Sequence, residues 1–591
     1  MIMKNRLTIA AAIFATVTLT GCLNDFLDKP AHNMTPETEL NDIVKMSSSI
    51  YNSFLGLNEG QGDALYSMGE IASDNALRGS ILSDGGTTDP ARQFNQFQNF
   101  TGINPASGNF IEALWNGLYP GIDQANINIR AFDRLFPDAD PALKMALTAE
   151  NRFARGWFYM HLVNIFGQVV LLPEDEITPK EYAELTNDRS IPELYEYLVA
   201  DLRFAADNLP TKQEWNDLFG LDWRGRAHDG SGKGYLAKAL LYQAANLSYY
   251  GGESETSPEE CYREIVQIVS SLEGEYDLYP DYEQIFREAG NFCVESMFEI
   301  GTKSTSDGTT RFAGWRPIQP RGYQGYGRLA PTLNLINQYE RDSEEKIIDL
   351  RYRGTILFGE TTPLSGMEHP GEEDEMRRIN GDVIKGIPFS GGIMAAGWPN
   401  RYCRKSVQPH PVSTTNTPQT NLGGANLKLL RWGEVLLIGA EAACHIGDES
   451  NARKWLKAVR KRAGLDEGMV DLLSGEALLE QIWKDKRLEI ALEWSNRYFE
   501  LVRIDKIQPG YMAACMKAKV DDELKGIRDH LDATDGWGNV YNARNFPMTR
   551  DNYAEVLPLR NGLTLPRHYT MPISTKIFST MLNLEQTTYY R

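Results

Sequence analysis

The stretch that decides the fold is residues 429–465, LLRWGEVLLIGAEAACHIGDESNARKWLKAVRKRAGL. Two helical runs flank the breaker Gly447-Asp448. The second run carries one apolar stripe at helical spacing, with Lys and Arg opposite it: Ala452, Trp455, Leu456, Val459 and Ala463. In the first run Gly439, Ala440 and Ala443 are small enough for a neighbouring helix to approach closely. The pattern predicts a helix hairpin of the tetratricopeptide kind.

Two earlier stretches have the same character. ENRFARGWFYMHLVNIFG (Glu150–Gly167) and GYLAKALLYQAANLSYYG (Gly234–Gly251) are apolar nearly all round and end at glycine. Helices of this composition must be buried by neighbouring helices, as in stacked helical pairs. No clean 34-residue consensus repeats, so we expect a mainly α fold in which a tetratricopeptide-like scaffold of helical pairs is irregular.

Two long segments, 302–330 and 354–428, are rich in Gly, Pro, Thr and Ser and lack helical periodicity. Short β-like runs such as Thr355–Phe358 interrupt them. Segments of this length in a compact protein are usually functional or disordered. We therefore expect a loop-rich half that binds ligand beside the helical scaffold.

The N-terminus reads as an export signal. Lys4 and Arg6 precede an apolar run, Leu7–Thr20, which is too short to span a membrane, and LTGC follows. We predict a signal peptide at 1–21, acylation of Cys22, a polar tether over 22–40 and a single body over 41–591. The body is expected to have a helical part at 41–250 and a C-terminal part at 251–591 that carries the two long loops.

Composition disfavours several kinds of function. The 60 basic and 80 acidic residues give a net charge of −20, and no basic stripe appears, so nucleic acid is not an expected partner. The six cysteines show no CxxC spacing, and the eight histidines never cluster at ligand spacing. GRAHDGSGKG (Gly225–Gly234) departs from the phosphate-loop pattern and reads as a loop and helix start. No metal site and no cofactor are predicted.

Many charged residues lie within or beside the C-terminal helices: Arg431, Glu434, Glu441, Arg460, Arg462, Arg487, Glu489, Glu493 and Arg497. One interpretation is a glycosidase carboxylate pair, which needs two acids across an open cleft. The favoured interpretation is an ion network that locks helices together, because alternating signs at helical spacing are typical of packed helices. Arg487 falls on the apolar stripe of its helix and is expected to need a carboxylate partner in an interface.

The segment GWRPIQPRGYQGYGRL (Gly314–Leu329) carries three aromatic residues where no helical face exists to bury them: Trp315, Tyr323 and Tyr326. A sugar ring offers a C–H face that stacks on an aromatic ring and hydroxyl groups that need hydrogen-bond partners. The same pattern also fits aromatic side chains that anchor the loop onto the helices. We predict that these residues bind ligand.

A second candidate stretch runs from Ser73 to Phe100 and contains several polar and aromatic residues: Asp74, Asn75, Arg78, Phe94 and Phe97. Of these, Asn75, Arg78 and Phe94 are predicted ligand contacts. Trp398, in GWPNRY, is a further candidate, although it can equally close its own loop.

Nine motifs in order along the chain carry a family resemblance: CLNDFLD, WNGLYPGIDQAN, AENRFARGWFYMHLVNIFG, GRAHDGSGKGYLAKALLY, NFCVESMFEI, PTLNLINQYE with Asp349 and Arg351, LLRWGEVLLIGAEA, KAVRKRAGL, and IWKDKRLEIALEWSNRYFELVR. Together they resemble the SusD/RagB family of outer-membrane lipoproteins of the Bacteroidetes type. Two places depart from the family pattern: EWSNR at 493–497, and the C-terminal QTTY at 586–589. These departures concern C-terminal packing.

The resemblance implies four tetratricopeptide-like pairs, a loop-rich half with the ligand site, and a stretch like Ser73–Phe100 beside that site. It also implies a SusC-like TonB-dependent transporter as partner, on which the lipoprotein sits as a lid. The expected function is a surface lipoprotein of the outer membrane, not an enzyme, that captures oligosaccharides and delivers them to the transporter. Peptide or glycopeptide binding, a glycoside hydrolase, and a structural lid that contacts no ligand are the alternatives.

Overall fold

The computed structural model describes residues 43–56, 62–79, 89–106, 109–251, 254, 256–301, 318, 327–358, 378–379, 382–383, 401–406, 424–494, 496–534, 549–551 and 561–591. The chain forms two compact units, Met1–Ser49 and Ile50–Arg591. The first contains the short helix α3 (Ile43–Ser48). All that follows concerns the second unit.

The described helices of the N-terminal half are α4 (Ile50–Gly56), α5 (Gly62–Ile71), α6 (Asp89–Asn99), α7 (Asn109–Leu135), α8 (Pro141–Phe166), α9 (Pro179–Glu184), α10 (Ile191–Asn208), α11 (Lys212–Phe219), α12 (Asp229–Tyr250) and α13 (Pro258–Ser271). The C-terminal half has α14 (Leu333–Gln338), α15 (Leu350–Thr355), α17 (Trp432–His445), α18 (Glu449–Arg462), α19 (Gly475–Glu489), α20 (Arg497–Ile507) and α21 (Tyr511–Thr534). Short 3-10 turns lie at Gln284–Phe286, Glu288–Gly290, Arg404–Ser406, Gly468–Leu472, Arg567–Tyr569, Ile577–Ser579 and Thr588–Tyr590.

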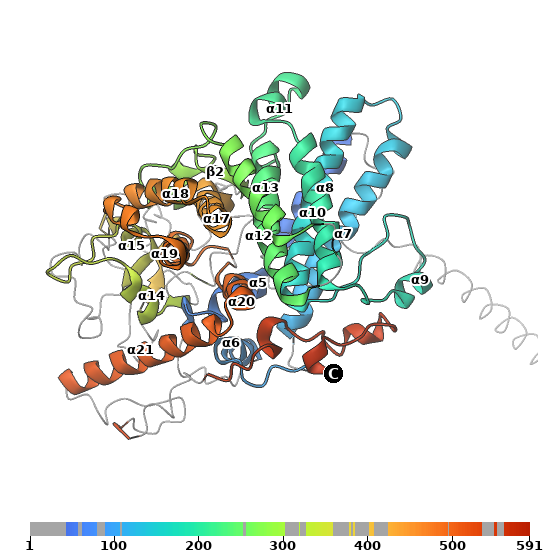
Figure 1. Cartoon of the computed structure of the whole chain (residues 1–591). Coiled ribbons are helices and arrows are strands. Elements are labelled where there is room, and N and C mark those ends of the chain that lie inside the picture. Colours follow the sequence, from blue (N-terminus) through green and yellow to red (C-terminus); the bar gives the residue numbers. More distant parts are fainter. Residues whose placement is uncertain are drawn as a thin grey trace, which may run out of the picture. The chain divides into compact units, whose positions relative to one another are not determined.

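The scaffold is a row of helices that pack on one another almost in chain order (Figure 1). Helix α7 packs on α8, α8 on α10, α10 on α12 and α12 on α13, and the row continues from α13 to α17 and from α17 to α18 and α19. The step from α13 to α17 crosses residues 272–431, which hold both long loops predicted from the sequence. The mainly helical class and the helical-pair scaffold are confirmed.

Local sequence fixes where these helices begin and how closely they pack. The carboxylate of Asp140 accepts hydrogen bonds from the Ala142 and Leu143 amides at 2.7 and 3.1 Å and so caps α8. A Cβ at Gly156 of α8 would lie 2.9 Å from the Leu202 side chain of α10. Glycine therefore lets α8 and α10 approach more closely than alanine would allow.

The helix hairpin predicted at 429–465 is present as α17 and α18, which flank Gly447 and Asp448. Asp448 caps α18 by accepting a hydrogen bond from the Asn451 amide at 3.2 Å. Gly439 faces two neighbours, because a Cβ there would lie 2.9 Å from Val269 of α13 and 3.0 Å from Trp455 of α18. The small residues of α17 thus allow the close approach that the sequence predicted.

Strands form four two-stranded antiparallel ladders in the described part of the chain. They pair β1 (Ala76–Gly79) with β3 (Arg328–Pro331), β2 (Ser296–Ile300) with β8 (Leu427–Arg431), β4 (Ile356–Phe358) with β7 (Arg401–Cys403), and β5 (Arg378–Ile379) with β6 (Asp382–Val383). Strand β8 leads directly into α17, so the β2–β8 ladder joins the loop-rich segment to the scaffold.

The C-terminal helices connect the two halves of this unit. Helix α20 packs on α12 of the scaffold and on α5, while α21 packs on α14 and α20 (Figure 1). None of the helices in the described ranges is long and apolar enough to cross a membrane.

Candidate ligand-binding site

The two stretches predicted to bind ligand meet at the β1–β3 ladder. Leu77 pairs with Ala330, and Gly79 pairs with Arg328. Since the strands are antiparallel, the segment after Gly79 and the segment before Gly327 leave the same end of the ladder. The stretches around Asn75 and around Tyr326 are about 250 residues apart in sequence, and this pairing joins their bases.

Glycine is required where the two segments separate. Gly79 has φ +68°, and a Cβ there would lie 2.1 Å from the backbone oxygen of Gly327. Gly327 has φ +65°. Both the left-handed conformation and the close approach of the two backbones exclude a side chain at Gly79. At this end of the ladder the two backbones therefore pack directly on each other.

Arg328 attaches the base of the aromatic loop to α6. Its guanidinium carbon lies 4.3 Å from the centre of the Phe94 ring. Phe94 in turn packs against Phe110 of α7 at 4.7 Å between ring centres. Burial lowers the pKa of Arg328 to about 10, and the stacked ring compensates part of the lost hydration.

The described candidate residues all lie in the interior. Asn75, Arg78 and Phe94 are 1, 5 and 1% exposed. The Asn75 amide donates to Glu70 at 3.2 Å, and its oxygen accepts from Arg487 at 2.9 Å. In this structure these residues support the loop base, and their contact with ligand stays a prediction. Cys22, Trp315, Tyr323, Tyr326 and Trp398 lie outside the described residues.

A clamp of cations from the C-terminal helices holds the start of β1. Arg497 of α20 binds the Asp74 carboxylate with two bonds of 2.7 and 2.9 Å. Arg487 of α19 reaches the same carboxylate at 3.0 Å, which confirms that Arg487 has a carboxylate partner in an interface. Lys519 of α21 donates to the Ser73 carbonyl at 2.6 Å. Three helices thus fix one short polar segment.

The charge of Asp74 is stabilised although the residue is fully buried. Burial opposes ionisation, but the guanidinium groups of Arg487 and Arg497 outweigh it and hold the pKa of Asp74 well below its usual range. Beneath it, burial raises the pKa of Glu70 to about 7. The Asp74 carboxylate is therefore an obligate part of the clamp, because its loss would leave buried cations without a counterion.

Helix α21 also holds strand β7, which follows the part of the second long segment that contains Trp398. The Glu523 carboxylate accepts from Arg401, the first residue of β7, at 2.8 and 3.0 Å. The same carboxylate accepts from the Leu333 amide at 2.6 Å, just after the end of β3. Arg401, where the described structure resumes after Trp398, therefore lies next to the C-terminal end of β3. Gly327 precedes the opposite end of that strand.

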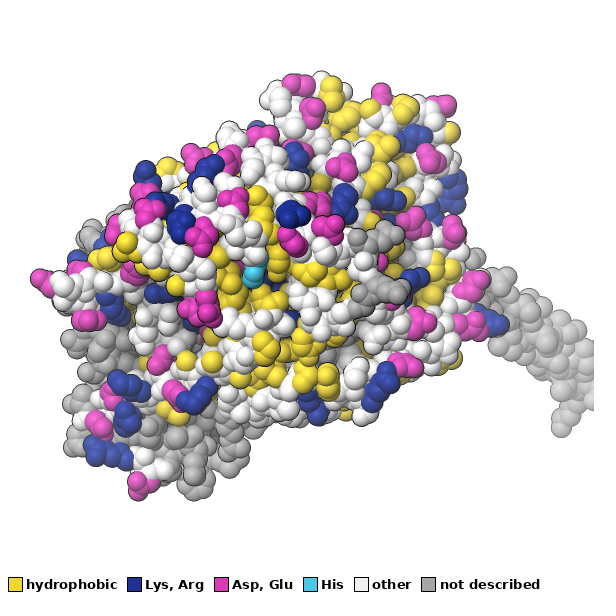
Figure 2. Space-filling model, viewed as in Figure 1, with side chains coloured by type: hydrophobic (Ala, Val, Ile, Leu, Met, Phe, Trp, Pro, Cys, Tyr) yellow, Lys and Arg dark blue, Asp and Glu magenta, His cyan; other side chains and the backbone are white. Residues whose placement is uncertain are grey.

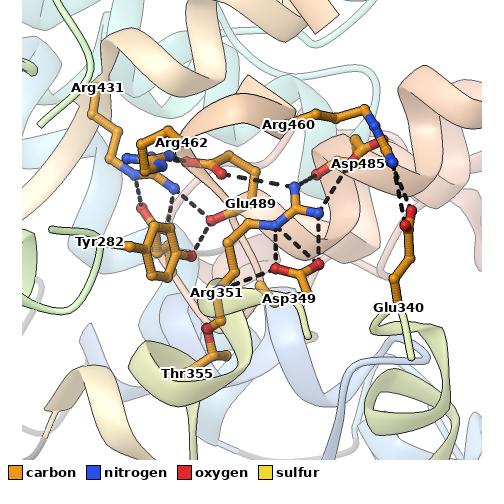
Figure 3. Close-up of polar contacts among 12 residues, drawn as sticks. Tyr282, Glu340, Asp349, Arg351, Thr355, Arg431, Arg460, Arg462, Asp485 and Glu489 are labelled. Atoms are coloured by element: carbon orange, nitrogen blue, oxygen red, sulfur yellow. Dashed lines mark hydrogen bonds and ion pairs between the residues drawn. The ribbon is translucent and has the colours of Figure 1, made fainter. Parts of the chain in front are cut away.

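The charged residues of the C-terminal helices form a buried network around Glu489 (Figure 3). Arg431 binds Glu295 at 2.7 Å and Arg462 binds the same carboxylate at 3.0 Å, while both arginines also contact Glu489. Arg431 further binds Glu493 at 2.7 Å. These contacts join β8, α18 and α19 to the segment that precedes β2.

A second part of the network surrounds Arg351 (Figure 3). Arg351 binds Asp349 at 2.7 Å and Asp485 of α19 at 2.8 Å. Asp485 also binds Arg460 of α18 at 3.2 Å, and Arg460 reaches Glu340 at 2.7 Å. The loop-rich segment that carries Glu340, Asp349 and Arg351 is thereby fastened to the scaffold.

The geometry of these carboxylates suits an ion network. Glu295 and Glu489 are fully buried and bound by guanidinium groups. Burial opposes ionisation of Glu489, but Arg462, Arg431 and Arg351 outweigh it and lower its pKa. A glycosidase needs an acid of raised pKa across an open cleft from a second carboxylate, and this arrangement offers neither. The interpretation as an ion network that locks helices is confirmed.

Two further sequence interpretations concern cofactors. Helix α12 begins at Asp229, so GRAHDGSGKG is a loop and helix start as predicted. Within the described ranges, no group of three or more His, Cys, Asp or Glu side chains is arranged to hold a metal ion.

Sequence reasoning missed the clamp partners Lys519 and Glu523, and it placed Arg497 in an ion network between helices without pairing it with Asp74. It also missed the β1–β3 pairing, because strands of four residues carry too little pattern. The one available signal was Arg487, a charge on an apolar stripe that required a partner.

Family models match most of the chain. A model described as the SusD family matches residues 283–590, and one described as "Starch-binding associating with outer membrane" matches residues 25–219. Among known proteins, the SusD-like protein P2 of Formosa agariphila is 24% identical over 514 residues, which are 83% of this chain and 89% of that protein. A SusD-like protein of Bacteroides ovatus is 22% identical over 400 residues, 66% of this chain and 64% of that protein.

Solved structures share the fold at low identity. A laminarin binding SusD-like protein superposes with a TM-score of 0.62 and 20% identity, covering 94% of this chain and 100% of that one. Surface glycan-binding protein A from Bacteroides thetaiotaomicron, in complex with laminarihexaose, gives a TM-score of 0.61 and 19% identity, covering 93 and 99%.

Proposed function

This chain belongs to the SusD family, and from that premise we propose that it is a glycan-binding lipoprotein of the outer membrane. In this proposal Cys22 carries the lipid anchor after the signal peptide 1–21 is removed, and the tether 22–40 holds the body at the cell surface. The body captures an oligosaccharide without covalent chemistry and delivers it to a SusC-like TonB-dependent transporter. The family model that describes association with the outer membrane supports this location.

The observation that carries the proposal is the β1–β3 ladder. The aromatic segment 314–326 and the segment after Gly79 both join this buried ladder at its Gly79–Arg328 end, and the Asp74 clamp holds the ladder in place. An ordered base shortens the part of each segment that must lose entropy when a ligand binds.

In the proposed site, Trp315, Tyr323 and Tyr326 stack on sugar rings, and Trp398 contributes from the second long segment, which re-enters the described structure at Arg401, near the opposite end of β3. Arg78, Asn75 and Phe94 act beneath them, where burial suits support of the loop more than broad ligand contact. Each stacked ring contributes about 1 kcal/mol by analogy with aromatic pairs. A few such contacts give modest affinity, which suits capture followed by transfer.

Laminarihexaose is the first ligand to test, because two proteins that share the fold are named for laminarin or laminarihexaose binding. Isothermal titration of the lipid-free protein would measure its affinity, with neutral oligosaccharides of other linkages and a peptide panel in parallel. Trp315→Ala and Tyr323→Ala are expected to weaken binding about fivefold or more each, from the loss of about 1 kcal/mol. Tyr182→Ala, at a partly exposed tyrosine of α9, is the matched control.

The outcome separates the alternatives. Binding of peptides but of no glycan would support the peptide-binding alternative. Release of shorter sugars from the oligosaccharide would support a hydrolase. Full affinity in both aromatic variants would place the ligand away from segment 314–326 and contradict the proposed site.

A further inference from the structure

Helix α6 lies against both strands that form the base of the candidate site. The Gln98 side-chain oxygen accepts a hydrogen bond from the Arg78 amide of β1 at 2.7 Å. One turn earlier on the helix, Phe94 stacks on the guanidinium of Arg328 in β3. Since Arg328 pairs with Gly79, the turn of α6 that carries Phe94 lies at the end of the ladder where the two predicted ligand-binding segments leave.

Asn95, the next residue of this turn, has a buried side-chain oxygen that accepts no hydrogen bond from any described residue. The side chain as a whole is half-buried. The other amide side chains described in α6 all form hydrogen bonds: Gln93 with the Phe110 amide, Gln96 with the Gly102 carbonyl, and Gln98 with the Arg78 amide and the Asn99 side chain. A buried acceptor without a donor is costly, so the Asn95 oxygen is the polar atom of this helix that has capacity for a ligand.

The position of Asn95 on the helix places it between the ladder and the C-terminal segment. Residues three and four apart share a helix face, so Asn95 lies one turn from both Gln98 and Asn99. Gln98 contacts β1, and the Asn99 carbonyl accepts from the Gly562 amide at 2.7 Å. Hydrophobic side chains gather on the surface below α12, where the C-terminal segment passes next to α6 (Figure 2). Such surroundings suit an uncharged ligand more than a charged one.

We propose that Asn95 is a specificity-determining residue of the oligosaccharide site, and that its side-chain oxygen accepts a hydrogen bond from a sugar hydroxyl. This inference rests on the proposed function and adds a requirement to it: the bound sugar unit must present a free hydroxyl at the Gly79 end of the ladder. A hydroxyl can donate to an amide oxygen, whereas a carboxylate or an ether oxygen cannot. Aromatic stacking tolerates many sugars, but a fixed acceptor rejects a sugar that lacks the matching donor.

The probes are laminarihexaose, maltohexaose and xylohexaose, and the one that the wild-type protein binds most tightly is used for every variant. Asn95→Leu keeps the approximate size of the side chain and removes the acceptor. Isothermal titration of the lipid-free protein should show that Asn95→Leu binds about fivefold or more weakly, as for the loss of one ordinary hydrogen bond. Asn95→Asp keeps an acceptor oxygen at the same place and should retain more of the affinity than Asn95→Leu.

Thermal unfolding of the same variants separates a ligand contact from a structural role. The Asn95 oxygen has no hydrogen bond to lose among the described residues, and leucine favours a helix more than asparagine does. Asn95→Leu should therefore leave the Tm unchanged or raise it. Gln96→Leu is the matched control on the same helix, because it removes the bond to the Gly102 carbonyl at 3.0 Å. This control should lower the Tm slightly and leave the affinity unchanged.

Full affinity in a folded Asn95→Leu variant would overturn this inference and leave the proposed function intact. Equal losses in Asn95→Leu and Asn95→Asp would also overturn it, because the ligand would then not require an acceptor. A lower Tm in Asn95→Leu together with weaker binding would assign Asn95 a structural role instead. If the wild-type protein bound none of the oligosaccharides, the proposed function would fail and this inference with it.

Discussion

Replacement of Asp74 by asparagine tests the clamp beneath the candidate site. Asp74 is fully buried and is bound by Arg497 at 2.7 and 2.9 Å and by Arg487 at 3.0 Å. Removal of one partner from a buried ion pair costs about 3–5 kcal/mol, because it leaves an uncompensated charge in the interior. Here two guanidinium groups would share the loss, so we expect Asp74→Asn to lower the free energy of unfolding by an amount in this range.

The assay is urea unfolding followed by circular dichroism and by tryptophan fluorescence at pH 7. Asp133→Asn is the matched control, because Asp133 pairs with Lys144 at 3.0 Å while its own side chain is 90% exposed. Such surface pairs contribute about 0–1 kcal/mol. Laminarihexaose titration of the same variants should show a loss of affinity for Asp74→Asn only, since β1 begins two residues later.

The pH dependence of stability should change with the charge. Since the folded-state pKa of Asp74 is depressed, its contribution is complete above the unfolded-state pKa of about 3.9 and is lost as pH falls toward the folded-state value. Wild type should therefore lose more stability than Asp74→Asn below about pH 4. A variant within about 1 kcal/mol of wild type at pH 7 would refute the clamp as an energetic element.

Three further changes have defined outcomes. Gly79→Ala should destabilise the protein and weaken laminarihexaose binding, because its Cβ would lie 2.1 Å from the Gly327 oxygen. The control is Gly225→Ala, which is also at positive φ but has no atom within 4 Å of the added Cβ. This control should lower the free energy of unfolding by only about 1–2 kcal/mol and leave binding intact. Burial lowers the pKa of His161 to about 3. The contribution of neutral His161 to the free energy of unfolding is therefore complete above about pH 6.5 and falls by up to about 1.4 kcal/mol per pH unit below it. His161→Phe should reduce this slope, measured by urea unfolding between pH 6.5 and 4. Cys22→Ala should abolish lipidation, and fractionation with metabolic labelling by a palmitate analogue should find the protein outside the membrane fraction; continued labelling would contradict the predicted anchor.

Local pattern predicted the scaffold well. The hairpin at 429–465 and the helices that end at Gly167 and Gly251 follow from apolar periodicity and breakers, which act within a few residues. The sequence also predicted that these helices pack against other helices, since small residues such as Gly439 allow close helix contact.

The base of the candidate site could not be predicted in the same way. SDNALRGS reads as a polar surface loop, yet Asp74 and Asn75 are buried. Their burial depends on Arg487, Arg497 and Lys519, which come from helices more than 400 residues later. A polar segment is buried when distant charges satisfy it, and a single sequence shows such pairs only where one member, here Arg487, interrupts an apolar stripe.

The energetics of the ladder explain why so many charges converge on it. Two strands of four residues are marginal in isolation, because few backbone bonds offset the entropy of ordering them. The cations that bind Asp74, and Glu523, which binds Arg401 and the Leu333 amide, act at the end of the ladder opposite Gly79 and supply the missing stabilisation from three helices. In the proposed site, a loop base that is ordered before the ligand arrives reduces the entropy lost on binding. It follows that variants of the clamp should weaken oligosaccharide binding without touching the ligand, and that variants of the Glu489 network, which fastens other segments, should lower stability with a smaller effect on affinity.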